Sequence, residues 1–224
     1  MASPTLYMDI ICPSCRSVLH TAKLLGVELE LKHVSLAKQE NHDDAFKKIN
    51  PTKKVPLLVD GYVKLGESRA ICRYLARKFA PENCSVYPTD IAQRSVIDWF
   101  LDFDLGTLYA AISRYFYPVY FKGQAEFDEA AGVNLKQALE TLSEFLKGDK
   151  FLGGDRMCLA DVCFTSSLST LEVMGYDLDP YPRVKSYYTA LKESEFFEAA
   201  HGEGMAIYKG RVDSIKAERE IPSE

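Results

Sequence analysis

The sequence predicts an α/β domain followed by an all-α helical bundle, and two observations carry this prediction. Strand and helix signals alternate over the first eighty residues, an order typical of a small sheet with helices packed against it. Strand patterning then disappears after Asp90, and long amphipathic stretches with helical spacing take its place. We therefore expect a first domain at residues 1–80, a linker at 81–89 and a helical domain at 90–224.

The elements of the first domain follow from the spacing of apolar residues and from turn signals. Strict alternation over 27–34 predicts a half-buried strand, and Asn50-Pro51 ends a short helix. Asp60-Gly61 between two apolar runs is a strong hairpin signal. The predicted order, βαβαββα, is strand 5–11, helix 13–25, strand 27–34, helix 41–49, two strands within 55–65 and helix 67–79.

The second domain is expected to contain helices alone. Their approximate ranges are 90–119, 125–147, 159–175 and 182–193. The highly charged stretch 211–224 is expected to form a further helix or a fraying tail.

Composition is that of an ordinary globular protein, because 47% of the 224 residues are hydrophobic and 26% are charged. The net charge of −5, with no block of basic residues, argues against nucleic-acid and anionic-membrane partners. No secretory signal is visible, and no apolar run approaches the roughly 20 residues of a membrane-spanning helix. Six cysteines without a disulfide-framework pattern indicate a reducing, cytoplasmic setting.

Cys12-Pro13-Ser14-Cys15 lies where the first strand should turn into a helix. The unpaired backbone N–H groups and dipole of a helix start favour thiolate, so this position can lower a cysteine pKa substantially. The alternative is that both cysteines are small apolar fillers, which suits Cys15 best. A zinc site needs two further ligands at matching spacing, and no second Cys-x-x-Cys is present, so no metal is expected.

Two more segments should converge on this turn if the strands pair as predicted. A cis bond at Val55-Pro56 would leave the Val55 backbone free to meet an extended peptide, whereas a trans proline would simply open an edge strand. Glu67-Ser68 begins a helix: ordinary capping explains both residues, but an anionic group can dock there while Glu67 binds an ammonium. Together the three segments describe a pocket for a small zwitterionic peptide that carries a thiol.

Several motifs resemble those of the cytosolic glutathione transferases, most closely the delta and epsilon classes of arthropods. The matching segments are 15–19, 21–29, 48–51, 55–60, 67–71, 103–109, 159–161 and 180–182. The resemblance covers nearly the whole chain and implies a thioredoxin-like first domain, a helical second domain and a homodimer. It also implies a glutathione site in the first domain, beside a hydrophobic acceptor site, and a role in detoxification.

The resemblance assigns roles to individual positions of the glutathione site. Val55, beside Pro56, would pair its backbone with the cysteinyl part of glutathione, while Glu67 and Ser68 would hold the γ-glutamyl end. Arg69 and Asp104 would support them, and Lys53 stands where these classes usually have a histidine near the glycine carboxylate. The catalytic position departs most, because Cys12 replaces the usual serine. Two further departures are Ser14, at a usual proline, and Gly66, at a common tryptophan.

Cys12 leaves three functions open. A glutathione transferase would conjugate glutathione to hydrophobic electrophiles. A glutathione-dependent thiol-disulfide oxidoreductase or dehydroascorbate reductase would use Cys12 as nucleophile on a disulfide substrate, with Cys15 able to resolve the mixed disulfide. A non-catalytic carrier would bind glutathione or a hydrophobic ligand without turning it over. Ser14 and Tyr7 are candidates to orient glutathione if Cys12 is inert.

The hydrophobic acceptor site should come from the aromatic run in the first long helix. These aromatic side chains are too many for one core face, so some must line a cavity or interface, while about half are expected to pack in the core. The candidates are Tyr109, Tyr115, Phe116, Tyr117 and Tyr120.

Overall fold

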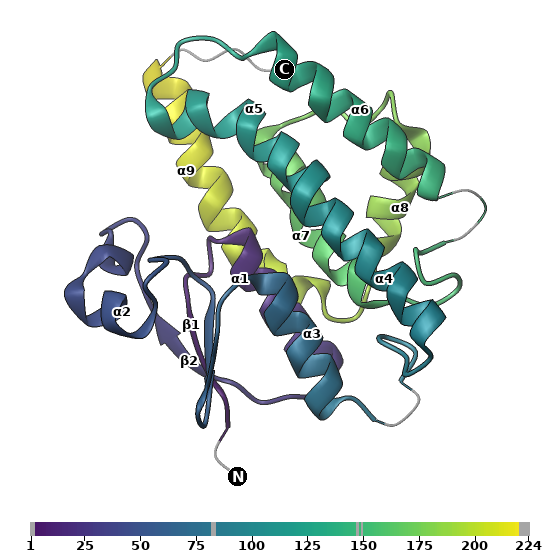
Figure 1. The fold of residues 1–224 in the computed structure, drawn as a ribbon. Helices are drawn as coiled ribbons and strands as arrows, with labels where there is room; N and C mark the ends of the chain where they lie inside the picture. Colours follow the sequence, from purple (N-terminus) through teal and green to yellow (C-terminus); the bar gives the residue numbers. More distant parts are fainter. Residues whose placement is uncertain (1–2, 82–83, 147, 149, 220–224) are drawn as a thin grey trace.

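A computed structural model describes residues 3–81, 84–146, 148 and 150–219. The chain folds into an α/β unit followed by an all-helical unit, which confirms the predicted fold class (Figure 1). The first unit has the predicted βαβαββα order of a thioredoxin-like domain. Its elements are β1 (Thr5–Met8), α1 (Pro13–Leu24), β2 (Glu30–His33), the 3-10 helix η1 (Glu40–His42), α2 (Asp44–Ile49), β3 (Leu57–Asp60), β4 (Val63–Leu65) and α3 (Ser68–Phe79).

The four-stranded sheet has the order β2-β1-β3-β4. β1 pairs in parallel with β2 and antiparallel with β3, so Leu6 lies between Leu31 and Leu58 in register. β3 and β4 form the predicted hairpin, whose turn contains Gly61 at φ +59°, a conformation that glycine adopts without strain. This arrangement leaves the carboxyl end of β1 free to lead directly into α1.

Strand β2 differs from its prediction. The alternation over 27–34 predicted half burial, but all four residues of β2 are exposed, and Leu31 retains 53% of its side-chain exposure. β2 is an edge strand, so only one of its sides is paired and its apolar positions remain open to solvent.

The second unit begins with one long helical run that the sequence predicts as a single helix. The run consists of α4 (Ile91–Phe103), the π-helical segment η2 (Asp104–Leu108) and α5 (Tyr109–Lys122). The wider π turn directs both Asp104 and Leu108 inward, each with 0% exposure. The remaining elements are α6 (Glu129–Phe145), α7 (Leu159–Met174), α8 (Pro182–Lys192), the π-helical η3 (Glu198–Gly202) and α9 (Glu203–Arg219).

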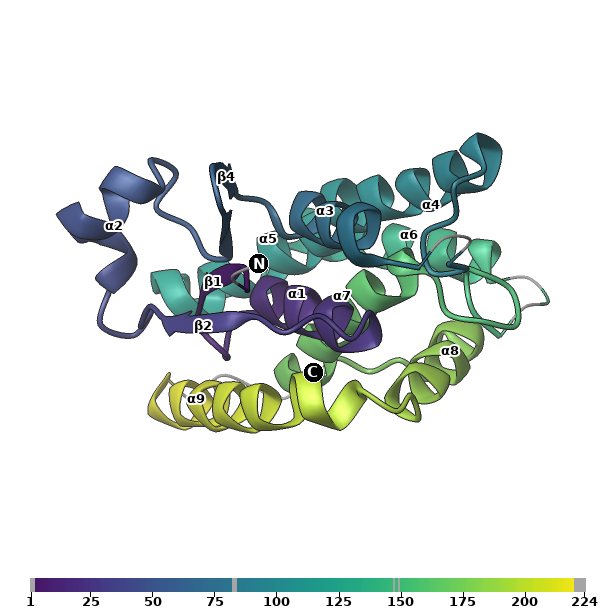
Figure 2. The same ribbon diagram turned by 90° about the horizontal axis from the view of Figure 1, so that it is seen from below.

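Helix α7 forms the centre of the molecule, and Figure 2 shows it beside α1. Every residue of α7 except Glu172 is buried, including a run of serine and threonine side chains. One of them, Ser166, bonds Ser17 of α1 through hydroxyl oxygens 2.8 Å apart. The two units therefore meet through hydrogen-bonded hydroxyls as well as apolar contacts.

Helix α9 begins earlier than the sequence indicated. The prediction started a helix or tail at Arg211, whereas α9 begins at Glu203; residues 220–224 lie outside the described part of the chain. Gly204 packs on the turn before α1, where an added Cβ would lie only 2.2 Å from the Ile10 carbonyl oxygen. No helix in the described ranges is both long and apolar enough to cross a membrane.

Candidate functional site

The Cys12-x-x-Cys15 motif forms the first turn of α1, as predicted. Cys12 is the N-cap residue with extended backbone (φ −76°, ψ 118°), and Pro13 follows at the first helical position. The backbone N–H groups of Cys15 and Arg16 both donate to the Cys12 carbonyl, at 3.0 and 3.1 Å. Cys12 is partly exposed and Cys15 is fully buried, so only the first thiol is open to a ligand.

The pKa values of the two thiols are shifted in opposite directions. A hydrogen bond from the Cys15 thiol is the largest cause that lowers the pKa of Cys12 to about 7; burial opposes it, and the Arg16 charge assists it. Burial, together with that same hydrogen bond and the charge at Cys12, raises the pKa of Cys15 well above its ordinary value. Cys12 is thus the thiolate of the pair near neutral pH, and Cys15 holds its proton.

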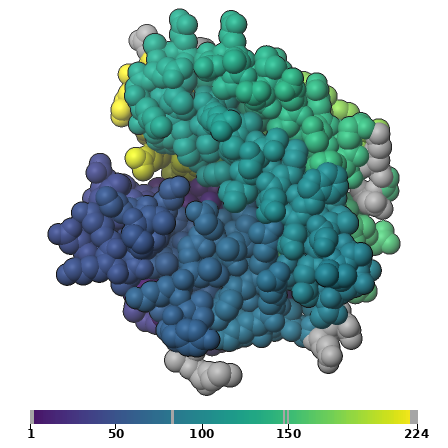
Figure 3. Space-filling model, viewed as in Figure 1, coloured from purple at the N-terminus to yellow at the C-terminus, as the bar shows by residue number. Residues whose placement is uncertain are grey.

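The Val55-Pro56 peptide bond is cis, which resolves the alternative that the sequence left open. It brings the Val55 carbonyl oxygen to 3.9 Å from Cys12 Sγ, the distance of a weak thiol hydrogen bond. The loop before β3 and the start of α1 therefore face each other. Figure 3 shows a hollow in the same region of the molecule, between the blue segment around α2 and the teal end of α5.

The start of α3 supplies a second group of polar atoms. Glu67 is exposed and adopts φ +60°, ψ 112°, a strained conformation for a residue with a side chain. Ser68 is buried, and its Oγ accepts a hydrogen bond from Arg69 Nη1 at 2.9 Å. Because the guanidinium occupies an acceptor site of Ser68, the hydroxyl proton is available to donate to a bound anion.

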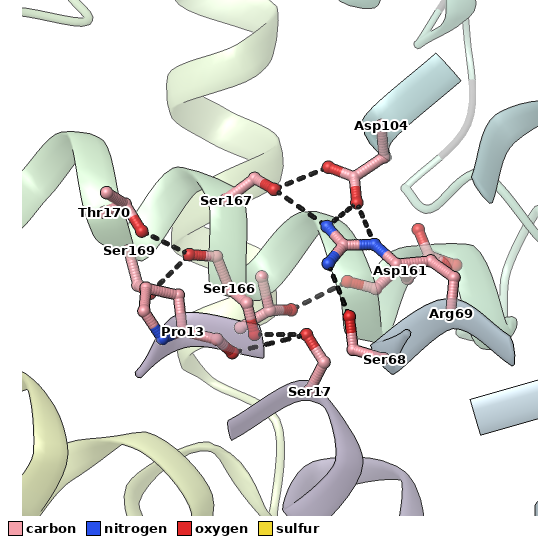
Figure 4. A network of polar contacts seen from close by, with 11 residues as sticks. Pro13, Ser17, Ser68, Arg69, Asp104, Asp161, Ser166, Ser167, Ser169 and Thr170 are labelled. Atoms are coloured by element: carbon pink, nitrogen blue, oxygen red, sulfur yellow. Dashed lines mark hydrogen bonds and ion pairs between the residues drawn. The ribbon is translucent and has the colours of Figure 1, made fainter. Parts of the chain in front are cut away.

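Arg69 and Asp104 form a buried ion pair beside Ser68 (Figure 4). Arg69 Nε lies 2.9 Å from an Asp104 carboxylate oxygen, and Ser167 Oγ donates to the other oxygen at 2.6 Å. Burial is the largest single influence and would lower the pKa of Arg69, but the Asp104 charge, its hydrogen bond and the other nearby groups together raise that pKa. With 2% and 0% exposure, neither side chain can reach a ligand, so they position Ser68.

Tyr109 and Tyr117 present hydroxyl groups on the Cys12 side of α5. Their oxygens are 3.0 Å apart, and both rings are partly exposed. Tyr208 of α9 interacts with Tyr117 and, like the other two hydroxyls, with the charge at Cys12. Burial raises the pKa of all three tyrosines, so they remain protonated hydrogen-bond donors.

The other aromatic candidates lie elsewhere. Phe116 (0% exposed) and Tyr120 (3% exposed) are core residues one helical turn apart, with their rings stacked 6.1 Å from centroid to centroid. Tyr115 stacks on Phe127 at 4.8 Å and contacts Gly132 of α6. Because Phe116 and Tyr120 are buried in the core and Tyr115 packs against Phe127, we leave these three side chains out of the candidate site.

Three polar candidates differ in their surroundings. Lys53 is exposed at φ +56°, and its carbonyl accepts a hydrogen bond from the Asn41 side chain. Ser14 is partly exposed in the first turn of α1. Tyr7 packs its ring edge-on against Phe46 of α2, with the Lys32 ammonium over its face, which makes it a structural residue.

Sequence reasoning missed Arg16 and Tyr208. Arg16 lies one helical turn after Cys12, a spacing that places both side chains on one face of the helix. An arginine is ordinarily predicted to be exposed, so the sequence did not indicate a role at the site. Tyr208 lies in a polar segment without a clear apolar face. All six cysteines are free thiols, and no cluster of three or more metal-ligating side chains occurs within the described ranges.

Comparison with known proteins agrees with this geometry. The glutathione S-transferase N-terminal domain family matches residues 3–77, and the C-terminal domain family matches 107–195. A delta-class glutathione transferase from Nilaparvata lugens is 35% identical, with a TM-score of 0.89 over 95% of this chain and 99% of that one.

Two other solved structures are similar over the same extent. An epsilon-class glutathione S-transferase from the housefly, Musca domestica, is 28% identical (TM-score 0.87; 95% of this chain, 98% of that one). A glutathione transferase homologue from Drosophila mojavensis, solved with bound glutathione, is 27% identical (TM-score 0.87; 96% and 98%). Because the two domain families together cover more than half of the sequence, the chain belongs to the glutathione S-transferase family.

Proposed function

We propose that this protein binds glutathione between the start of α1, the cis-proline loop and the start of α3, and conjugates it to hydrophobic electrophiles. The observation that carries the proposal is the facing pair of Cys12 Sγ and the Val55 carbonyl across the cis Val55-Pro56 bond. A backbone edge beside a reactive sulfur position suits an extended peptide with a central thiol. The relative from Drosophila mojavensis, which holds glutathione, supports the same ligand.

Each charged end of glutathione has a matching group. The Ser68 hydroxyl, with the N-terminal N–H groups of α3, would bind the γ-glutamyl carboxylate, and Glu67 would bind the adjacent ammonium. The exposed Lys53 ammonium would serve the glycine carboxylate as a mobile point charge. Val55 would pair its backbone with the cysteinyl residue. This placement directs the glutathione sulfur toward Cys12.

Conjugation then needs a thiolate and an acceptor surface. The glutathione thiolate attacks the electrophilic carbon, a C–S bond forms, and the leaving group departs with its electron pair. Tyr109 and Tyr117 would line the acceptor side, where their protonated hydroxyls can stabilise negative charge that develops on the electrophile.

Thiol-disulfide exchange is a second candidate, which the acidity of Cys12 favours. The Cys12 thiolate would attack the glutathionyl sulfur of a mixed disulfide, forming a Cys12–glutathione disulfide and releasing the substrate thiolate. A second glutathione thiolate would then attack the glutathionyl sulfur of this disulfide, which forms oxidised glutathione and releases the Cys12 thiolate. Alternatively, Cys15 would lose its proton and attack Cys12 Sγ, which forms a Cys12–Cys15 disulfide and releases reduced glutathione. Both candidates use the same glutathione site and differ in what Cys12 does.

Two assays on three proteins separate these candidates. Aryl-halide conjugation and reduction of a glutathione mixed disulfide are measured for the native chain, Cys12→Ser and Cys12→Ala. If Cys12 serves exchange, Cys12→Ser abolishes reduction and raises conjugation, because a hydroxyl is the better hydrogen-bond donor to the glutathione sulfur. Undiminished conjugation by Cys12→Ala shows that Cys12 does not activate glutathione in conjugation.

Binding itself is tested by titration calorimetry. Ser68→Ala removes a hydrogen bond to a charged group, so the dissociation constant for glutathione should rise about tenfold or more. A native chain that shows no heat of binding to glutathione would falsify the proposed site. Binding without turnover in either assay would indicate a glutathione or hydrophobic-ligand carrier instead.

We also propose that two copies associate through α4. This helix exposes Val96 (48%) and Trp99 (56%), large apolar side chains that a monomer would leave in water. Sedimentation velocity should give about twice the 25.2 kDa chain mass, and Trp99→Glu should return the species to that of one chain.

A further inference from the structure

Arg16 is a buried cation that the proposed reaction does not yet use. Its side chain has 0% exposure. One guanidinium nitrogen, Nη1, donates to the carbonyl oxygens of Ile10 (3.3 Å) and Ile11 (2.9 Å), and Nη2 donates to Ser169 Oγ (3.3 Å). The remaining nitrogen, Nε, is buried without a partner.

No carboxylate pairs with Arg16 in the described part of the chain. This is unusual, because a fully buried arginine is ordinarily neutralised by an acidic side chain. Ile10 and Ile11 directly precede Cys12, so the guanidinium underlies the turn that carries the reactive thiol. The first turn of α1 also contains no acidic residue.

The titratable groups around Arg16 come from each element packed against it. They are Cys12 and Cys15 of α1, Tyr109 of α5, Tyr188 of α8, His201 of η3 and Tyr208 of α9. Burial raises the pKa of the three tyrosines and of Cys15 and lowers the pKa of His201, so these groups are neutral near pH 7. Cys12 is therefore the group facing Arg16 that can become an anion there.

The surroundings keep water away from this charge. Helix α9 approaches so closely that a Cβ on Gly204 would lie 2.2 Å from Ile10 O and 2.9 Å from Arg16 Cδ. Helix α7 closes another side through Ser169. In such a low-dielectric site a charge acts more strongly on its neighbours than it would in water.

We propose that Arg16 is a positioning residue that supplies the counter-charge for the Cys12 thiolate and fixes the Ile10–Cys12 turn from beneath. The inference deepens the proposed function, because it concerns the thiol at the centre of the same site. Its consequence is that Cys12 replaces the missing carboxylate: the buried cation and the thiolate neutralise each other. Protonation of Cys12 leaves the cation without a partner.

The rate of Cys12 alkylation by iodoacetamide between pH 5 and 10, read by peptide mass spectrometry, tests the proposal without any glutathione. The native midpoint should lie near pH 7. Arg16→Gln keeps a donor for the carbonyls and removes the charge, so its midpoint should rise by about half a pH unit, with a rate about threefold slower at pH 6. Arg16→Lys keeps the charge and should stay closer to the native midpoint.

The test includes a control variant and an alternative pair of variants. Arg183→Met removes an exposed arginine that pairs with Glu144, and its midpoint should remain native, which excludes a net-charge effect. If Arg16→Gln does not fold, Cys12→Asp and Cys12→Asn are compared in the native background. An aspartate at position 12 carries a negative charge next to Arg16 at pH 7, so Cys12→Asp should have a higher free energy of unfolding than Cys12→Asn.

The proposal is overturned if folded Arg16→Gln and Arg16→Lys share the native midpoint, or if Cys12→Asn is more stable than Cys12→Asp. These outcomes are independent of ligand binding. A chain that fails to bind glutathione but shows the shifted midpoint loses the proposed function and keeps the role of Arg16.

Discussion

Two arginines are almost fully buried in this protein, and they differ in their partners. Arg69, at the start of α3, meets the Asp104 carboxylate and two serine hydroxyls. Arg16, in α1, meets two carbonyl oxygens and one serine, with no carboxylate in the described ranges. A buried charge with a counter-ion holds two elements of the fold together. A buried cation without one can lower the pKa of an acidic group beside it.

The difference divides the proposed glutathione site into a rigid side and a reactive side. The Arg69–Asp104 pair joins α3 to the π turn of the long helix and positions Ser68, whose charge would not change in the proposed reaction. Arg16 lies against the Cys12 turn, where charge appears and disappears. Variants on the first side should therefore act on stability, and variants on the second side should act on acidity.

The largest effect is expected from Asp104→Ala. Removal of this carboxylate leaves Arg69 buried without a counter-charge, which typically costs about 3–5 kcal/mol. Urea unfolding should show this loss. The matched variant Arg16→Met removes a cation that has no carboxylate partner, so it should cost clearly less; equal losses would contradict the distinction between the two arginines.

The second-largest effect is expected from acid, which should destabilise the reactive side. His20 and His201 are both fully buried, with ring nitrogens 3.1 Å apart. Burial lowers the pKa of His20 to about 4, and burial with the His20 and Arg16 charges lowers the pKa of His201. The unfolded chain therefore binds more protons below pH 6.5, so stability present at neutral pH is lost as pH falls toward 4, by about 3 kcal/mol from His20.

The check is the free energy of unfolding at pH 7 and at pH 5. The double variant His20→Leu with His201→Phe should show a shallower dependence on pH, since it carries no buried imidazole. An unchanged slope would assign the acid sensitivity to other groups.

Most of the fold was predictable, because it follows from local periodicity. The βαβαββα order, the Asp60-Gly61 hairpin and the Cys12 helix start all came from spacing and turn residues. The π turn at Asp104–Leu108 did not, because a one-residue widening leaves no local signal and depends on the partner that Asp104 finds in Arg69. Helix α9 was placed too late because its buried residues form a narrow stripe, Gly204, Tyr208 and Val212.

The candidate site was predictable in its positions and less so in its electrostatics. Cys12, Val55 and Ser68 were identified from their motifs, and the structure brings Cys12 and Val55 together. Arg16 could not be identified as buried, since its environment comes from Ser169 and Gly204, far along the sequence. Phe116 and Tyr120 belong to the half of the aromatic candidates that pack in the core, and the sequence could not single them out because helical spacing does not say which face meets the core.

A pair of serines on α7 offers a smaller and closely matched test. Ser167 donates to the Asp104 carboxylate at 2.6 Å, whereas Ser169 accepts from Arg16 at 3.3 Å. Ser167→Ala should cost about 2 kcal/mol, as expected for a bond to a buried charged acceptor, and Ser169→Ala about 1 kcal/mol or less. Thermal and urea unfolding measure both; the reverse ranking would contradict the stronger constraint on the Arg69 side.

The smallest effect is expected from Cys15→Ala, which separates the influence of Arg16 on the pKa of Cys12 from that of Cys15. Cys15→Ala removes the hydrogen bond that is the largest cause of the low pKa of Cys12 and leaves the guanidinium in place. The alkylation midpoint of Cys12 should rise by about one unit, which slows alkylation about tenfold below the midpoint. It should nevertheless stay below the ordinary cysteine value near 9, because Arg16 still faces the sulfur. Adding Arg16→Gln to Cys15→Ala should bring the Cys12 midpoint up to the ordinary cysteine value. If Cys15→Ala alone already reaches that value, the hydrogen bond from Cys15 by itself sets the pKa of Cys12.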